Sequence, residues 1–328
     1  MRAAVCTAYG SPEVLKIKEV ETPNPKNNEV LIKIFATTVT SACVRIRSST
    51  FPFGFGFLAR LGFGFRRPRN NILGTELAGE VESVGKDVKL FKKGDQVFGG
   101  AGIGLGTYAE YKCLPEDGVI TIKPTNKTYE EVAGVAFGGM TALYFLKKAN
   151  IQKGQKVLIY GASGAIGTYA VQLAKHFGAE VTAVCSTTNL GLVKSLGADN
   201  VVDYTKEDFT NNVETYDVIF ETVGKTTFSL CKNALKEKGI YLAALLDLPQ
   251  HFPLLWRSTI SSKKMLGGMT SEPIEDLISL KDLIESGEIK SVVDRSYPLE
   301  EIVEAHKYVE KGHKKGNVVI TMEHNSKS

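Results

Sequence analysis

Residues 156–167 read Lys-Val-Leu-Ile-Tyr-Gly-Ala-Ser-Gly-Ala-Ile-Gly, and this stretch decides the fold. The apolar run from Val157 to Tyr160 predicts a buried strand, which breaks into a turn of glycine and other small residues. The residues that follow, 168–176, have the apolar spacing of a helix. Small residues between a strand and a helix let the backbone approach a pyrophosphate, whose charge suits a helix N-terminus. We therefore predict a dinucleotide-binding turn in mid-chain, and the residues before it must form a separate unit.

The composition is ordinary for a soluble globular protein. The chain has 328 residues, enough for two domains, with 43% hydrophobic and 23% charged residues. A chain of this length buries a large core and needs no disulfides. Its odd, dispersed set of cysteines suits a reducing cytoplasm, and the absence of a C-x-x-C pair argues against a zinc ribbon or a thioredoxin-type site. The five cysteines are Cys6, Cys43, Cys113, Cys185 and Cys231.

The sequence also argues against several other classes of protein. Residues 1–9 lack a long apolar core and a cleavage site, so we expect no signal peptide. No run of about 18 apolar residues is present, so we expect no membrane-spanning helix. The net charge of +4 is mixed in sign along the chain and too small to indicate nucleic-acid binding. We expect a cytoplasmic protein.

The pattern of strands and helices changes near residue 124. Before that point, glycine and proline punctuate short strand patterns, as in a compact all-β unit. After it, strand and helix patterns alternate, which predicts an α/β fold with a doubly wound parallel sheet. The expected strands are 30–36, 78–85, 96–98, 108–114, 157–160, 181–185, 201–202, 218–220, 239–245 and 318–321. The expected helices are 129–135, 141–149, 168–176, one from about residue 190, 226–235, 277–285 and 299–311.

The glycine turn departs slightly from the dinucleotide fingerprint G-x-G-x-x-G. Its three positions are Ala162, Gly164 and Gly167, with Gly161 just before them. The specificity position follows the next strand, where an acidic residue would bind the ribose of NAD. Here the chain reads Cys-Ser-Thr-Thr-Asn over residues 185–189, without a carboxylate or an arginine. The hydroxyls of Ser186 and Thr187 favour NADPH over NADH, although Ser and Thr at such a place also serve as helix caps.

A second interpretation of the same turn is a nucleophile elbow. Residues 161–165 nearly match G-x-S-x-G, which would make Ser163 the nucleophile of a hydrolase. His251, His306 and His313 follow it in the chain. The fifth position is Ala165 rather than glycine, and Gly167 suits only the dinucleotide turn, so the hydrolase is the weaker hypothesis.

Residues 51–67 form an unusual segment with six phenylalanines and four glycines beside several arginines. One interpretation is a loop or short helix that packs on the first domain, because aromatic residues usually lie in a core. Another is a hydrophobic flap over a substrate pocket. A third, which we favour least, is a membrane-surface patch.

Taken together, the motifs resemble the medium-chain dehydrogenase/reductase superfamily over nearly the whole chain, and most closely its zinc-independent quinone oxidoreductase-like members. The order and spacing of the matching stretches are far more specific than any single motif. These stretches are 29–34, 72–85, 91–98, 106–111, 141–143, the glycine turn, 196–204, 217–224 and 316–320.

The resemblance implies a GroES-like, β-rich catalytic domain at residues 1–123, to which residues 266–328 return. It implies a Rossmann NADP-binding domain at residues 124–265 and a homodimer. Alcohol dehydrogenases of the superfamily bind catalytic zinc through a Cys and a His, where this sequence has Thr40 and Thr75. Hydroxyls are poor zinc ligands, so we expect no metal. The resemblance implies that Glu76 matches the acidic residue that often accompanies the Cys and His at the zinc site.

Without a Lewis acid, the expected reaction is reduction of a quinone or an α,β-unsaturated carbonyl, in which a conjugated carbonyl accepts the charge. Relatives usually carry Asn at the Thr40 position and Asp at the Cys43 position, so the pocket here is less polar and the substrate a small hydrophobic electrophile. Cys43 is either a pocket residue or a small buried one. An alternative function is a weakly catalytic or non-catalytic NADPH-binding structural or regulatory protein. The resemblance implies catalytic residues Thr40, Cys43 and Thr141, and cofactor-binding residues Thr141, Ala162, Ser163, Gly164, Ala165, Ile166, Gly167, Ser186, Thr187, Tyr204, Val223 and Gly224.

Overall fold

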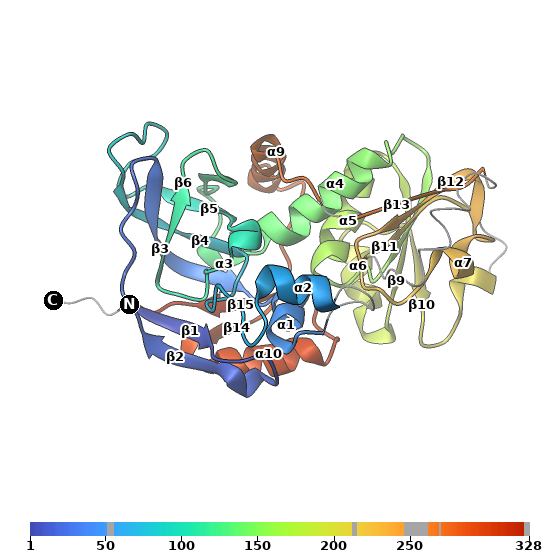
Figure 1. Ribbon diagram of the computed structural model, residues 1–328. Coiled ribbons are helices and arrows are strands. Elements are labelled where there is room, and N and C mark those ends of the chain that lie inside the picture. Colours follow the sequence, from blue (N-terminus) through green and yellow to red (C-terminus); the bar gives the residue numbers. More distant parts are fainter. Residues whose placement is uncertain (51–55, 212–214, 246–261, 269, 325–328) are drawn as a thin grey trace.

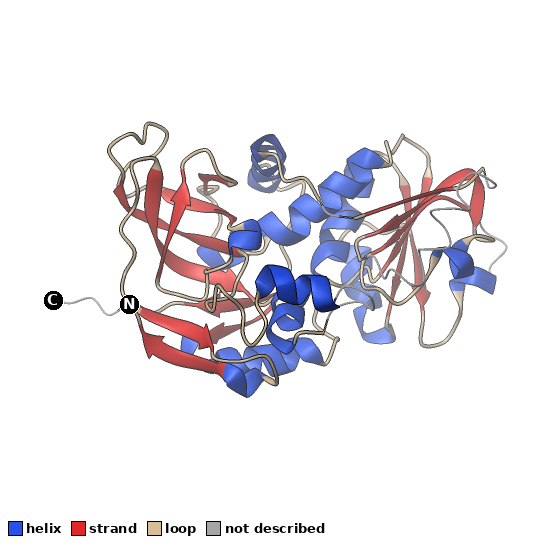
Figure 2. Cartoon of the chain, in the orientation of Figure 1, coloured by secondary structure: helices blue, strands red, loops and turns tan. Residues whose placement is uncertain are grey.

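Two sheets lie at opposite ends of the molecule, with most of the helices gathered between them (Figures 1 and 2). The computed structural model describes residues 1–50, 56–211, 215–245, 262–268 and 270–324. None of the helices in these parts of the chain has the length and apolar character needed to span a bilayer.

The sheet nearer the N-terminus has seven strands, ordered β14-β15-β3-β4-β5-β7 with β6 paired to β3. Of its two strands from the end of the chain, β15 pairs with β3 and β14 pairs with β15, so the C-terminal segment completes this sheet. A separate hairpin, β1–β2, packs beside it. The strands are β1 (Arg2–Cys6), β2 (Leu15–Glu19), β3 (Glu29–Thr38), β4 (Glu76–Val84), β5 (Gln96–Gly100), β6 (Tyr111–Pro115), β7 (Ile120–Ile122), β14 (Val293–Pro298) and β15 (Asn317–Thr321). The helices of this domain are α1 (Ser41–Ser48), α2 (Gly56–Phe63) and α10 (Ile302–Glu310).

The second sheet is fully parallel, with the order β10-β9-β8-β11-β12-β13. This is the doubly wound order in which the first strand and the fourth lie side by side, and ligands bind at that switch point. The predicted α/β architecture is therefore confirmed. The strands are β8 (Lys156–Tyr160), β9 (Glu180–Cys185), β10 (Asn200–Asp203), β11 (Tyr216–Glu221), β12 (Leu235–Ala243) and β13 (Lys264–Gly267). The helices of this domain are α4 (Met140–Lys148), α5 (Ala165–His176), α6 (Leu190–Ser195) and α7 (Phe228–Cys231), while α9 (Ile274–Glu285) follows β13 and contacts both α4 and β7.

A short connecting region joins the two domains. It consists of α3 (Tyr129–Val132), which begins with a capping box at Thr128, and a π-helical stretch, Val135–Gly139. One buried cluster runs through this region, because it contains Phe98 of the N-terminal sheet, Phe145 of α4 and Val157 of β8. The domains therefore share part of their core. Short 3-10 turns occupy Pro12–Val14, Gly102–Gly104, Thr187–Asn189, Phe209–Asn211 and Leu299–Glu301.

The structure differs from the predicted elements at two places in the second domain. The helix expected at 226–235 is only one turn long, because Leu235 already pairs with Tyr216 as the start of β12. The domain boundary expected after residue 265 falls inside β13, which pairs with β12 through Gly267.

Candidate active site

The glycine turn has the geometry that its sequence predicts. Gly161 has a φ of +81°, and the N–H of Gly164 donates to its carbonyl at 3.0 Å, which closes a tight turn. A Cβ on Gly167 would lie 2.2 Å from the Gly161 oxygen, so only glycine allows α5 to pack this closely on β8. Gly164 is the N-cap of α5 and supplies no side-chain cap. The first N–H groups of the helix are therefore available to an anion, as the pyrophosphate of a dinucleotide requires.

Three cavities follow one another across the molecule, and we name them outer, central and inner. The outer cavity, about 470 Å³, lies over the end of β8 and the loops after β10 and β11. The central cavity, about 540 Å³, contains the glycine turn and Thr40. The inner cavity, about 500 Å³, lies in the N-terminal domain. Lys225 lines both the outer and the central cavities, and Phe137 lines both the central and the inner ones. The three spaces thus form one row.

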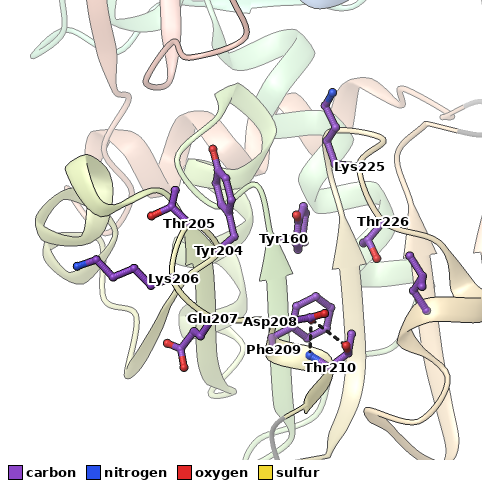
Figure 3. Close-up of a pocket in the computed structure, with 11 residues that line it drawn as sticks. Tyr160, Tyr204, Thr205, Lys206, Glu207, Asp208, Phe209, Thr210, Lys225 and Thr226 are labelled. Atoms are coloured by element: carbon purple, nitrogen blue, oxygen red, sulfur yellow. Dashed lines mark hydrogen bonds between the residues drawn. The ribbon is translucent and has the colours of Figure 1, made fainter.

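The outer cavity has an aromatic wall and a charged rim (Figure 3). Tyr160 and Tyr204 lie with their ring centroids 6.5 Å apart, and Tyr204 is 47% exposed. Lys225 extends from the loop after β11 at its rim, whereas Lys206, on the loop after β10, extends away from the two tyrosines. Flat aromatic surfaces with nearby cations suit a heteroaromatic ring that carries phosphate groups.

The hydroxyl groups that follow β9 already make hydrogen bonds within the protein. Thr187 donates its hydroxyl to the Asp203 carboxylate, and Asn189 donates to the hydroxyls of Ser186 and Ser163, at 3.2 and 3.0 Å. The Thr187 and Thr205 hydroxyls hold the pKa of Asp203 at about 2, so this group is a carboxylate. The sequence pattern missed it because it belongs to the next strand, where parallel pairing places Asp203 opposite Cys185.

The C-terminal segment crosses over the glycine turn. The N–H of Gly316 donates to the Ser163 carbonyl at 2.8 Å, and Gly164 and Gly316 form a β-bridge. Lys314 lines the central cavity beside the turn, and its ammonium donates to the Gly316 carbonyl at 2.6 Å. Burial lowers the pKa of Lys314 to about 8, against the charges of Glu76 and Asp294. A buried ammonium at a dinucleotide turn is well placed to bind phosphate, and sequence reasoning did not identify it.

Val223 and Gly224 lie opposite the turn, at the end of β11. The Glu221 carboxylate accepts N–H groups from Val223, Gly224 and Lys225 at 2.9, 2.6 and 3.1 Å, which fixes this loop. Val223 lines the central cavity with Ala165 and Ile166. These residues fit the ribose and pyrophosphate of a dinucleotide between β8 and β11.

Thr40 lies in the wall of the central cavity. It is the N-cap of α1, where its oxygen accepts the Cys43 N–H at 3.1 Å. Its hydroxyl proton therefore stays available to a ligand. Phe137, in the π-helical stretch, lines the central and inner cavities. Thr141, one turn later, is largely buried, with 8% of its surface exposed. The Phe137 N–H donates to Glu76 at 2.7 Å, and burial raises the pKa of Glu76 to about 7.

Cys43 lies in the core of the N-terminal domain, without exposed surface. Tyr108, also fully buried, donates its hydroxyl to the Thr38 carbonyl at 3.3 Å, and burial raises the pKa of Tyr108 well above its usual range. This placement favours the structural interpretation of Cys43 over a role in the pocket.

The inner cavity is mainly apolar. Ile46, Phe63 and Leu105 line it, together with Thr75 and Glu272. Phe63 ends α2, so the part of the Phe-rich segment that the structure describes reaches this cavity, as the flap hypothesis expects. Residues 51–55 of that segment lie outside the described residues. The Thr75 hydroxyl is buried and has no hydrogen-bond partner within the described parts of the chain.

The arrangement around Ser163 does not favour a hydrolase. Its hydroxyl accepts a hydrogen bond from Asn189, and His306 lies in the other domain against Tyr108, with ring centroids 5.7 Å apart. Burial lowers the pKa of His306 to about 3. His251 lies outside the described residues.

Two protein families match the chain. The family described as alcohol dehydrogenase GroES-like domain matches residues 26–124, which confirms the predicted GroES-like domain. The family described as zinc-binding dehydrogenase matches residues 196–320. Among the residues that the structure describes, no group of three His, Cys, Asp or Glu side chains is arranged to bind a metal ion.

Individual relatives match over most of their length. The 2-methylene-furan-3-one reductase of Solanum lycopersicum is 33% identical over 98% of this chain and 79% of its own. The chloroplastic NADPH-dependent alkenal/one oxidoreductase of Arabidopsis thaliana is 31% identical over the same shares. The solved structure of the quinone oxidoreductase from Coxiella burnetii superposes with a TM-score of 0.88 at 29% identity, and covers 98% of this chain and 99% of that one.

Proposed function

The chain belongs to the medium-chain dehydrogenase/reductase superfamily, among its quinone and enone oxidoreductases, and from this we propose that it is a zinc-free, NADPH-dependent reductase of quinones or α,β-unsaturated carbonyls. The row of three cavities is the observation that carries the proposal. It offers an extended groove for a dinucleotide and, next to its inner end, an apolar space for a substrate.

The proposed division of roles follows the row. Tyr160 and Tyr204 bind the adenine side, and the N–H groups of residues 165–167 bind the pyrophosphate together with Lys314. Thr40 donates a hydrogen bond at the nicotinamide end, near Phe137. When bound, the cofactor supplies a hydride. The apolar lining of the inner cavity excludes water and selects a small hydrophobic electrophile.

The preference for NADPH rests on two observations. Ser186 and Thr187 offer hydroxyl oxygens, and Lys225 supplies positive charge at the rim of the outer cavity. Asp203 opposes a 2′-phosphate, which the sequence did not predict, but Lys206 lies 3.7 Å from its carboxylate and offsets the charge. Titrations with NADPH and NADH test the preference, and tighter binding of NADH would contradict it.

The zinc-free state rests on Thr40 and Thr75, which occupy the positions of zinc ligands in related alcohol dehydrogenases. Neutral hydroxyls bind zinc weakly beside thiolate and imidazole. Metal analysis of the purified protein is expected to find no stoichiometric zinc, and one zinc ion per chain would refute this part of the proposal.

Turnover tests the function as a whole. The purified protein is expected to oxidise NADPH in the presence of enones or quinones. Binding of NADPH without oxidation across a broad panel of both classes would instead support a structural or regulatory role. The two-domain division, the homodimer and the cytoplasmic location remain predictions that accompany this proposal.

A further inference from the structure

Glu272 places a carboxyl group in the wall of the inner cavity. It precedes α9 and lines the cavity with Phe63, Leu105 and Ala136. One carboxyl oxygen accepts the Thr270 hydroxyl at 3.5 Å. The other points toward Gly102, where a Cβ would lie 4.0 Å from it. A carboxyl group in an apolar cavity, with one oxygen that has no partner among the described residues, is available to a substrate.

The surroundings of Glu272 favour its protonated form. Burial raises its pKa, and only the Thr270 hydroxyl opposes that shift, so no cation among the described residues offsets its charge. The other titratable groups nearby are Glu76, whose pKa the Glu272 charge raises further, and Lys314, which faces Glu76 from the central cavity. Two carboxyl groups that repel each other do not both ionise readily.

We propose that Glu272 is the general acid that protonates the substrate after hydride transfer. This inference rests on the proposed function and assigns a proton donor to it. Hydride addition forms a C–H bond at the β-carbon of an enone and moves the C=C electron pair into an enolate. The O–H bond of Glu272 then breaks, and its proton forms the new bond at the α-carbon. The carboxylate regains a proton from solvent.

Thr75 supplies the second polar group of this site. Thr75 lines the same cavity, and its hydroxyl is buried in the wall without a partner in the described parts of the chain. A substrate carbonyl oxygen would accept that hydroxyl proton, which orients the α-carbon and stabilises the enolate charge. Cys43 and His306 do not compete for the acid role because both lie in the core of the N-terminal domain.

The test uses Glu272→Gln in the full chain, with an enone that carries a methyl group on its α-carbon. Protonation of this substrate creates a stereocentre. We expect kcat to fall by about 100-fold or more, within the usual contribution of a positioned acid. We also expect the product to change from one predominant enantiomer to a near-racemic mixture, because solvent then supplies the proton to both faces. NADPH affinity is expected to stay at the wild-type value.

Glu275→Gln is the matched control, since Glu275 is exposed and three residues away. It is expected to keep both the rate and the enantiomeric excess. Unchanged kcat and enantiomeric excess in Glu272→Gln, with an active wild-type protein, would overturn the inference alone. A wild-type protein that reduces neither enones nor quinones would overturn the proposed function, and this inference with it.

Discussion

At the scale of single residues, two glycines of one turn have separable roles. A Cβ on Gly167 would lie 2.2 Å from the Gly161 oxygen and 2.7 Å from the Ala162 Cα, whereas one on Gly164 would meet only the Gly161 oxygen, at 3.4 Å. Gly167 therefore serves packing of the helix on the strand, and Gly164 leaves space for a ligand.

Gly167→Ala is expected to lower the free energy of unfolding by about 1–3 kcal/mol, the usual cost of overpacking. Gly164→Ala, the matched variant, is expected to keep near-wild-type stability but to bind NADPH more weakly, because its methyl group stands in the phosphate cradle. Denaturant unfolding and fluorescence titration measure the two effects. Equal losses of stability in both variants would contradict this division of roles.

The charge of Lys314 predicts a pH dependence of cofactor binding. Burial lowers its pKa to about 8 in the free protein, and only the protonated form attracts phosphate. Bound phosphate raises that pKa, so binding takes up a proton, and NADPH affinity is expected to fall as the pH rises above about 8.

Variants at position 314 test this directly. Lys314→Met is expected to bind NADPH weakly at all pH values, whereas Lys314→Arg keeps its charge and should lose the alkaline decline. Lys315→Met serves as the neighbouring control. Equal pH profiles for the wild-type protein and Lys314→Met would show that another group titrates.

At the scale of elements, the start of α1 combines capping with chemistry. As the N-cap, Thr40 accepts a hydrogen bond from the Cys43 N–H, and its own hydroxyl proton can be donated to a ligand in the central cavity. Thr40→Val is expected to lose about 0.5–2 kcal/mol of stability with the cap, and to lower kcat as well. Thr40→Ser should retain most of both properties. Thermal unfolding and NADPH oxidation measure them, and a normal kcat in Thr40→Val would exclude the hydroxyl from the reaction.

Local pattern predicted the glycine turn, most strands and the order of elements, because these depend on neighbours in sequence. It could not place Asp203 beside Thr187, since that contact requires the pairing of β9 with β10. The prediction of a helix at 226–235 was wrong for a similar reason, because Leu235 pairs with Tyr216 in the parallel sheet. The periodicity of a sequence predicts each helix or strand separately and does not indicate which other elements it will pair with or pack against.

The candidate site shows the same limit. Its predicted residues Thr40, Gly164 and Val223 line the central cavity, whereas Cys43 faces a core. Lys314 and Glu272 come from distant parts of the chain and carry no local motif. Only the return of the C-terminal segment brings Lys314 to the glycine turn.

At the scale of the whole molecule, helix α5 holds the C-terminal segment in register with the cofactor groove. Gln172, 7% exposed, donates to the Lys290 carbonyl at 3.0 Å and accepts the Lys290 N–H at 2.7 Å. Tyr169 and Ser291 share a further hydrogen bond of 2.7 Å. These contacts, with the bond between Gly316 and Ser163, tie the segment that completes the N-terminal domain to the Rossmann domain.

Gln172→Ala should therefore weaken cofactor binding although Gln172 lies outside the cavities. It leaves both Lys290 backbone groups unpaired, at a cost of about 1–3 kcal/mol, and loosens the segment that carries Lys314. NADPH affinity is expected to fall several-fold, while the affinity for 2′,5′-ADP, which lacks the pyrophosphate and nicotinamide, stays unchanged. Gln152→Ala, at an exposed position, is the control. If both ligands lose affinity equally, the effect is a general loss of the Rossmann fold and does not arise from the position of the returning segment.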